Sequence, residues 1–142
     1  MARKLKTYDL KQVNVVFNGR VLSGAAESDF VTVEMNEDAW THHVGADGEE
    51  ARSRSNNNSG KITVKLSQYS EDNKILSEFH EADKSSGSGV APIMVKDKSG
   101  LSIHGTDEAY ISKAPAAGYG KTPGDREWVF NCANMKHFVG GN

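Results

Sequence analysis

The heptapeptide KITVKLS, residues 61–67, alternates strictly between polar and apolar side chains. Alternation with a period of two is typical of a β-strand that has one face in the core and the other in water. The predicted core face carries Ile62, Val64 and Leu66, and the predicted wet face carries Lys61, Thr63, Lys65 and Ser67. This stretch therefore anchors a prediction of β structure.

The chain before this strand follows the same pattern. Residues 12–17 alternate, and the Asn18-Gly19 dipeptide that follows favours a two-residue hairpin turn because both residues accept positive φ angles. A returning strand is then expected over residues 20–22. A further alternation covers residues 30–35 and resumes over residues 40–44.

One helix is predicted after the heptapeptide. Ser70 is a candidate N-cap, two acidic residues follow it, and the flexible SSGSG run at residues 85–89 ends the helix. The predicted apolar stripe consists of Ile75, Leu76, Phe79 and Ala82. Later strands are expected at residues 93–95, 101–103, 109–112 and 127–138, the last with Trp128, Phe130 and Cys132 on one face.

This order of elements fixes the expected fold class. Six or seven strands with one inserted helix, and no regular alternation of strands and helices, favour an antiparallel β-sandwich or small barrel over a parallel α/β fold. The length of 142 residues and mass of 15.4 kDa fit a single domain over residues 1–142.

Residues 45–60 form a polar stretch, GADGEEARSRSNNNSG, that is too poor in apolar side chains to fold by itself. We expect a long mobile loop there. Compact domains seldom keep a structureless loop of this length unless it is functional or ordered by a partner. A loop that is simply mobile at the surface is the other interpretation.

Charge is unevenly distributed along a chain whose net charge is only −2. Residues 21–51 hold eight acidic residues and no Lys or Arg, whereas residues 52–68 hold four basic residues and no acid. Two solvated surfaces would explain these blocks. They would equally suit a subunit whose opposite charges meet in a neighbouring copy. The acidic residues are Glu27, Asp29, Glu34, Glu37, Asp38, Asp47, Glu49 and Glu50.

The sequence predicts no catalytic, cofactor-binding or metal site. Cys132 is the only cysteine, so an intrachain disulfide and a zinc site built on paired cysteines are excluded. The GYGKT run at 118–122 lacks the earlier glycine of a phosphate-binding loop, since Pro115 stands in its place. His42 and His43 are neighbours on a predicted strand and point to opposite faces. We expect no enzyme, no cofactor and no metal.

The first residues, MARKLK, are basic, but no long apolar run follows them. A cleaved export signal and a membrane-spanning helix are therefore not expected. With a single cysteine, a reducing compartment is the predicted environment.

Four segments together resemble the tail tube proteins of contractile-tailed bacteriophages, which are related to tube proteins of phage-like injection machines. The resemblance covers nearly the whole chain and rests on the pattern of strands, long polar stretch and single helix. The segments are YDLKQVNVVFNGRVLSG (8–24), VTVEMNEDAWTHHVGADGEEARSRSNNNSGKITVKLSQYS (31–70), EDNKILSEFHEAD (71–83) and REWVFNCANMKHFVGGN (126–142).

The resemblance implies a structural virion protein without catalytic residues. Six copies would form a ring, strands of neighbours would join into one barrel around the lumen, and rings would stack into a tube. DNA would pass through the lumen during ejection without being bound specifically. The implied partners are further copies of the chain and the tail sheath, baseplate and tail-terminator proteins, with assembly in the host cytoplasm and no membrane.

Two groups of residues are candidates for this role. The candidate inter-ring contacts are Asp47, Glu49, Glu50, Arg52 and Arg54, and the candidate lumen face is Thr32, Glu34, Lys61, Thr63, Lys65 and Ser67. We expect Glu34 or Glu127 to offset the two lysines across strands. The alternative function is a monomeric β-sandwich module that binds carbohydrate or protein on Trp40, Trp128 or Tyr119.

Overall fold

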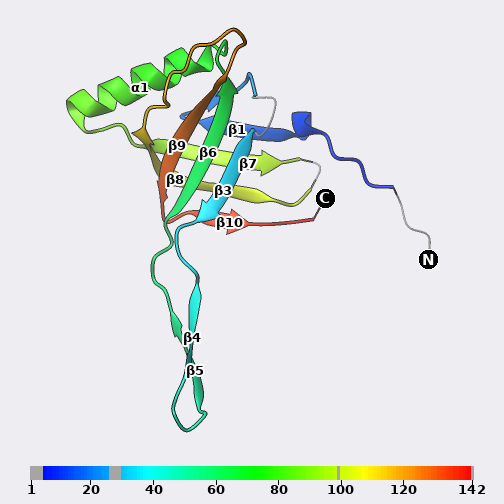
Figure 1. Cartoon of the computed structure of the whole chain (residues 1–142), viewed down its shortest axis with the longest axis vertical. Coiled ribbons are helices and arrows are strands. Elements are labelled where there is room, and N and C mark those ends of the chain that lie inside the picture. Colours follow the sequence, from blue (N-terminus) through cyan, green and yellow to red (C-terminus); the bar gives the residue numbers. More distant parts are fainter. Residues whose placement is uncertain (1–4, 26–29, 99, 142) are drawn as a thin grey trace.

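The computed structural model describes residues 5–25, 30–98 and 100–141. Strands form a two-layered body, with the helix α1 at one end of the longest axis and a long hairpin at the other (Figure 1). The elements are η1 (Leu10–Gln12), β1 (Val13–Phe17), β2 (Arg20–Val21), β3 (Val31–Met35), β4 (Trp40–Val44), β5 (Glu50–Arg54), β6 (Gly60–Ser67), α1 (Asp72–Ser86), β7 (Ala91–Asp97), β8 (Ile103–Lys113), β9 (Asp125–Ala133) and β10 (Lys136–Phe138).

All strand pairs of the described residues are antiparallel. The main sheet has the order β2-β1-β7-β8-β9-β6-β3, and β10 also pairs with β8. The first part of the long strand β8 pairs with β7 and β10, and its second part pairs with β9. Strand β8 thus belongs to both layers. The predicted antiparallel β fold with one α-helix is confirmed.

The core lies between the two layers. Ile62, Val64 and Leu66 of β6 are fully buried, and Trp128 and Phe130 of the neighbouring strand β9 are buried beside them. The strict alternation of the heptapeptide therefore predicted its buried face correctly. The predicted turn after β1 is also present, with φ of 52° at Asn18 and 80° at Gly19.

The expected loop over residues 45–60 is wrong. Strand β5 (Glu50–Arg54) lies inside it and pairs with β4, so the stretch is the second half of a β-hairpin. Every residue of β5 is exposed, which explains why its sequence shows no apolar alternation. Glu27 and Asp29 of the acidic block lie outside the described residues.

The expected single strand over residues 127–138 is also wrong. Asn134 has a φ of 49°, and the chain turns there between β9 and β10. A left-handed residue reverses the direction that a continuous strand would keep. The buried face of Trp128, Phe130 and Cys132 is confirmed within β9.

The apolar stripe of α1 differs from the prediction. Leu76 is buried, and the Phe79 ring packs edge-on against Phe17 with 4.9 Å between the ring centroids. Ile75 and Ala82, however, are exposed. The inward face begins instead with a charged residue, Asp72, whose side chain is 1% exposed.

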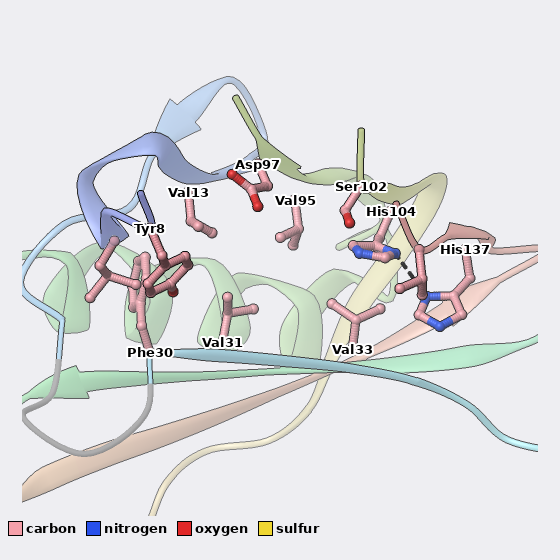
Figure 2. Close-up of a pocket in the computed structure, with 12 residues that line it drawn as sticks. Tyr8, Val13, Phe30, Val31, Val33, Val95, Asp97, Ser102, His104 and His137 are labelled. Atoms are coloured by element: carbon pink, nitrogen blue, oxygen red, sulfur yellow. Dashed lines mark hydrogen bonds between the residues drawn. The ribbon is translucent and has the colours of Figure 1, made fainter. Parts of the chain in front are cut away.

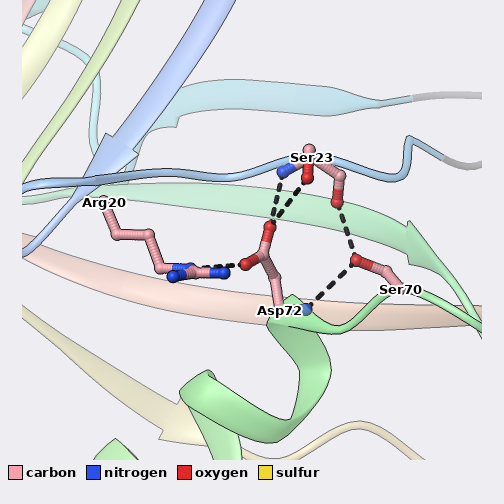
Figure 3. A network of polar contacts seen from close by, with 4 residues as sticks. All are labelled: Arg20, Ser23, Ser70 and Asp72. Carbon is pink, nitrogen blue, oxygen red and sulfur yellow. Dashed lines mark hydrogen bonds and ion pairs between the residues drawn. The ribbon is translucent and has the colours of Figure 1, made fainter.

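Asp72 joins the start of α1 to the segment after β1 (Figure 3). Its carboxylate accepts hydrogen bonds from Arg20 Nε at 2.6 Å and from Ser23 N at 2.6 Å. The predicted N-cap at Ser70 is wrong, because Glu71 is the N-cap residue of α1. Ser70 Oγ accepts a hydrogen bond from Asp72 N at 3.3 Å and donates one to Ser23 O at 2.7 Å. The first residue of helix α1 is therefore tied to Arg20 of β2 and to Ser23 after it, while both residues of β2 stay exposed.

The environment of Asp72 lowers its pKa. Burial by itself raises the pKa, but the hydrogen bonds from Ser23 and the charge and hydrogen bond of Arg20 outweigh burial. The carboxylate is thus charged in the folded protein, and the stability that it contributes is lost only as the pH falls below 3.8 and through the lowered value.

We expect Asp72→Asn to lower the free energy of unfolding by about 2 kcal/mol, because the buried network loses its negative charge and one of its two acceptor oxygens. Urea denaturation at fixed protein concentration measures the loss. Glu78→Gln on the exposed side of the same helix is the control, and it should change stability by less than about 0.5 kcal/mol. Equal effects of the two substitutions would contradict the role of Asp72.

Candidate assembly interface

The segment 36–59, here called the arm, projects from the body (Figure 1). Its two strands β4 and β5 pair only with each other, and all their residues are exposed. Hydrogen bonds continue the hairpin toward the body, from Ser55 N to Ala39 O at 2.8 Å and from Asn36 N to Ser59 O at 3.1 Å. The arm is therefore an ordered hairpin with no core of its own.

The base of the arm is fixed to the body. Met135 N donates to Asn58 O at 2.8 Å, which ties the turn between β9 and β10 to the arm. The terminal methyl of Met135 packs against Gly60, and a Cβ atom at this position would meet both that methyl and the carbonyl oxygen of Glu34. A larger residue at position 60 would therefore require the Met135 side chain to move.

The five residues predicted as inter-ring contacts all lie on the arm. Asp47 and Glu49 are in the turn at its tip, where Asp47 Oδ1 accepts a hydrogen bond from Glu49 N at 3.1 Å. Glu50, Arg52 and Arg54 follow on β5. The structure thus places the acids at the tip and the two arginines nearer the body.

Sequence reasoning missed a cluster on one face of the arm. The Arg52 guanidinium carbon lies 3.7 Å from the centroid of the Trp40 ring, and that of Arg54 lies 5.5 Å from it. On the same face, His42 Nε2 and Glu50 Oε1 are 3.1 Å apart. These contacts depend on the register between β4 and β5, in which Trp40 is opposite Arg54. An aromatic ring with arginines at an exposed site is typical of interface hot spots.

The residues predicted to face the lumen lie mostly together. The register places Thr32 opposite Thr63 and Glu34 opposite Lys61, so β3 and β6 share one outer face. Lys61 Nζ lies 3.2 Å from Glu34 Oε1, as predicted. Ser67 is different, because it is buried and donates a hydrogen bond to Ala25 O at 2.9 Å.

Strand β9 extends this outer face. Glu127 stands opposite Lys65, and Asn131 stands opposite Lys61. Glu34 and Glu127 thus match the charges of the two lysines. We define the outer face as Thr32, Glu34, Lys61, Thr63, Lys65, Glu127, Val129 and Asn131. It has a balanced charge and is polar apart from Val129.

A cavity of about 570 Å³ opens between the two layers beside β3 (Figure 2). We call it the mouth. Val31 and Val33 of β3 line one side, and Val13 and Val95 line the other. Both β3 valines are only partly buried. Apolar side chains of the core are therefore accessible to solvent at this place.

A histidine pair lies at one end of the mouth. His104 of β8 is directly opposite His137 of β10, and their Nδ1 atoms are 2.8 Å apart. Burial lowers the pKa of His104, and the neighbouring His137 lowers it further. The residues are 33 positions apart in the sequence, so only the strand pairing could have predicted their contact.

Residues considered for chemistry are not assembled into a reactive site. His42 and His43 make separate contacts, His43 with Ser53 at 2.9 Å. The Cys132 thiol is buried, and burial raises its pKa to about 11. Among the described residues no group of three or more His, Cys, Asp or Glu side chains could hold a metal ion, and no helix in those ranges is long and apolar enough to cross a membrane.

The aromatic residues proposed as a binding platform are not equivalent. Trp128 is buried, and its indole Nε1 donates to Asn73 Oδ1 at 2.9 Å. It cannot be a surface platform, and that part of the alternative function is wrong. Tyr119 is exposed, with the Arg126 guanidinium carbon 5.4 Å from its ring centroid.

Residues 7–140 match the model of the bacteriophage PhiTE tail tube protein family. The chain belongs to this tail tube family. It is a structural component of a phage tail and not an enzyme, which confirms the resemblance found in the sequence. Structural protein ORF10 of Pseudomonas phage KPP10 is 36% identical over 150 residues, covering 100% of this chain and 87% of the relative.

Solved structures of tube-terminating proteins share the fold of this tail tube family member. The anti-feeding prophage cap, a tube-terminating cap, has a TM-score of 0.68 and 9% identity over 98% of this chain and 95% of the cap. The sheath/tube terminator of an extracellular contractile injection system, in its extended state, has a TM-score of 0.65 and 10% identity over 95% of this chain and 99% of the terminator. At these identities the likeness concerns the fold.

We expect the tail tube protein to lose stability as the pH falls through 6.5, the ordinary pKa of histidine. The unfolded chain binds a proton on His104 more tightly than the folded chain does, so acid favours unfolding. Unfolding midpoints above and below pH 6.5 measure the effect. His104→Gln should flatten the dependence, whereas His43→Gln on the exposed arm should leave it unchanged. The same slope in all three proteins would contradict the role of the histidine pair.

Proposed function

We propose that the chain is the repeating subunit of a contractile tail tube. Six copies form a ring, rings stack head to tail, and DNA passes through the channel during ejection. Each subunit is a single tail-tube-like domain over residues 1–142. The tail sheath, baseplate and tail-terminator proteins are its partners, and assembly takes place in the host cytoplasm.

The observation that carries this proposal is the placement of the arm. The arm projects from one end of the longest axis, and α1 lies at the opposite end (Figure 1). Two different surfaces at opposite ends make a heterologous contact, which repeats without closing when copies are stacked along an axis. An exposed hairpin without its own core gains stability when a neighbour covers it.

The charges of the arm support a directional stack. Asp47, Glu49 and Glu50 make its tip acidic, and Arg52 and Arg54 lie closer to the body. Complementary charges steer association and set the register of an interface more than they add affinity. The five residues thus serve as inter-ring contacts in this proposal.

The outer face of β3, β6 and β9 is proposed to line the channel. Excess basic charge there would bind the phosphates of DNA and slow its passage. Lys61 lies beside Glu34 at 3.2 Å, and Lys65 stands opposite Glu127. The paired charges leave a polar wall without net positive charge. Ser67 is excluded from that wall because it is buried.

A tube terminator is the second candidate function, favoured by the fold that the chain shares with two tube-terminating proteins. A terminator needs only one surface for stacking, because elongation stops at its ring. A tube subunit needs two. The arm and α1 provide a distinct surface at each end, which favours the repeating subunit.

We expect negative-stain electron microscopy of the purified protein to show rings and stacked tubes. Single rings that never stack would support the terminator, and a monomer at high concentration in the presence of tail assembly factors would contradict both functions. Glu49→Lys with Glu50→Lys should abolish tubes and leave rings, because it reverses the charge of the arm tip. Glu49→Asp with Glu50→Asp keeps the charge and should keep the tubes. Unchanged tube yield after charge reversal would contradict the contact role of the arm tip.

A further inference from the structure

Strand β3 has an open side. In an antiparallel pair, alternate residues direct their backbone groups toward the partner strand. Lys65 N donates to Phe30 O at 2.7 Å, and Asn36 N donates to Ser59 O at 3.1 Å. The even-numbered residues of β3 therefore bond to β6. Val31, Val33 and Met35 direct their N–H and C=O groups to the other side.

Within the ranges that the structure describes, no strand pairs with that side of β3. At the opposite edge of the sheet, Asp72 at the start of α1 bonds to Arg20 of β2 and to Ser23 after it. The two edges thus differ. An uncovered edge is a template for a strand of another chain.

The mouth makes this edge apolar as well. Val31 and Val33 point into the cavity and face Val13 and Val95 across it (Figure 2). The outward row of β3, by contrast, is polar, with Thr32 and Glu34 exposed. A strand that completes β3 therefore needs an apolar side chain on its inner face and a basic or polar one on its outer face.

The N-terminal segment Leu5–Thr7 meets these requirements. Leu5 is 96% exposed, and the segment is not part of a helix or sheet. In an extended chain, Leu5 and Lys6 point to opposite faces. Leu5 then matches Val31 and Val33, and Lys6 matches the row that contains Glu34.

Charge also favours this pairing. The first six residues of the sequence contain Arg3, Lys4 and Lys6 and no acid, whereas residues 21–51, which include β3, contain eight acids and no Lys or Arg. Opposite charges on the two segments guide their encounter and disfavour pairing of β3 with another β3.

The direction in which the segment leaves the body favours a neighbouring copy. Asp9 begins η1, since its carboxylate accepts a hydrogen bond from Lys11 N at 3.0 Å and its carbonyl accepts one from Gln12 N at 3.0 Å. The Tyr8 side chain lines the mouth of its own chain (Figure 2). Residues 5–7 continue away from the body (Figure 1).

We propose that the N-terminal segment Leu5–Thr7 of one subunit pairs with the open side of β3 in the adjacent subunit and covers its mouth. This inference rests on the proposed function, because it names the contact that links neighbours within the assembly. The pairing adds a backbone-paired strand to β3 and removes apolar side chains of the mouth from water.

Disulfide trapping between two proteins that each carry one introduced cysteine tests the pairing. One protein carries Lys6→Cys, and its partner, of different mass, carries Thr32→Cys or Glu34→Cys on the outward row of β3. Both are mixed, assembled and mildly oxidised, and the products are separated on a non-reducing gel. Native Cys132 does not compete, because its thiol is buried and its pKa is raised to about 11. Ser77→Cys on the exposed side of α1 is the control partner.

We expect cross-linked heterodimers with cysteine at position 32 or 34 and none with cysteine at position 77. Removal of residues 1–7 should reduce assembly while leaving the far-ultraviolet circular dichroism of the subunit unchanged. An intramolecular disulfide in a monomer that carries both Lys6→Cys and Thr32→Cys would overturn the inference in favour of pairing within one chain.

Electron microscopy of the same samples distinguishes failure of the N-terminal pairing from failure of the proposed tube function. Rings without a cross-link at position 32 or 34, and with full assembly after the truncation, would overturn the N-terminal pairing and leave the tube function standing. Absence of rings under all conditions would overturn the tube function and this inference together.

Discussion

The pairing of β6 with β9 and β3 is the constraint on which the rest of the subunit depends. Ile62, Val64 and Leu66 are fully buried in this register, and a slip by one residue would move Lys61 and Lys65 toward the core. The same register pairs Met35 with Gly60. It therefore brings both ends of the arm to one point of the body.

The two edges of the sheet have different consequences for assembly. At β2, Asp72 at the start of α1 accepts hydrogen bonds from Arg20 and from Ser23, which follows the strand. At β3, three residues direct backbone groups to a side without a strand partner in the described part of the chain. A subunit whose two sheet edges differ in this way is suited to heterologous contacts between neighbours. The arm adds a second such contact along the axis.

The sequence predicted what a local pattern can encode. Alternation located the faces of β1, β3 and β6, and the Asn18-Gly19 dipeptide located the first turn. Strand β5 was missed because EARSR is exposed on every side and carries no apolar alternation. The inward position of Asp72, the Trp40 cluster and the histidine pair depend on contacts between distant segments, so no local pattern indicates them. The predicted inter-ring residues do lie together on the arm, but their contact with another ring remains a prediction.

The central claim is that a neighbouring copy completes the open side of β3. Hydrogen exchange of the Val31, Val33 and Met35 amides, compared between unassembled subunits and assembled tubes, tests it most directly. We expect rapid exchange of these three amides in the unassembled subunit and strong protection in tubes, with the backbone amides of β6 protected in both states. Equally rapid exchange of the three amides in both states would contradict it.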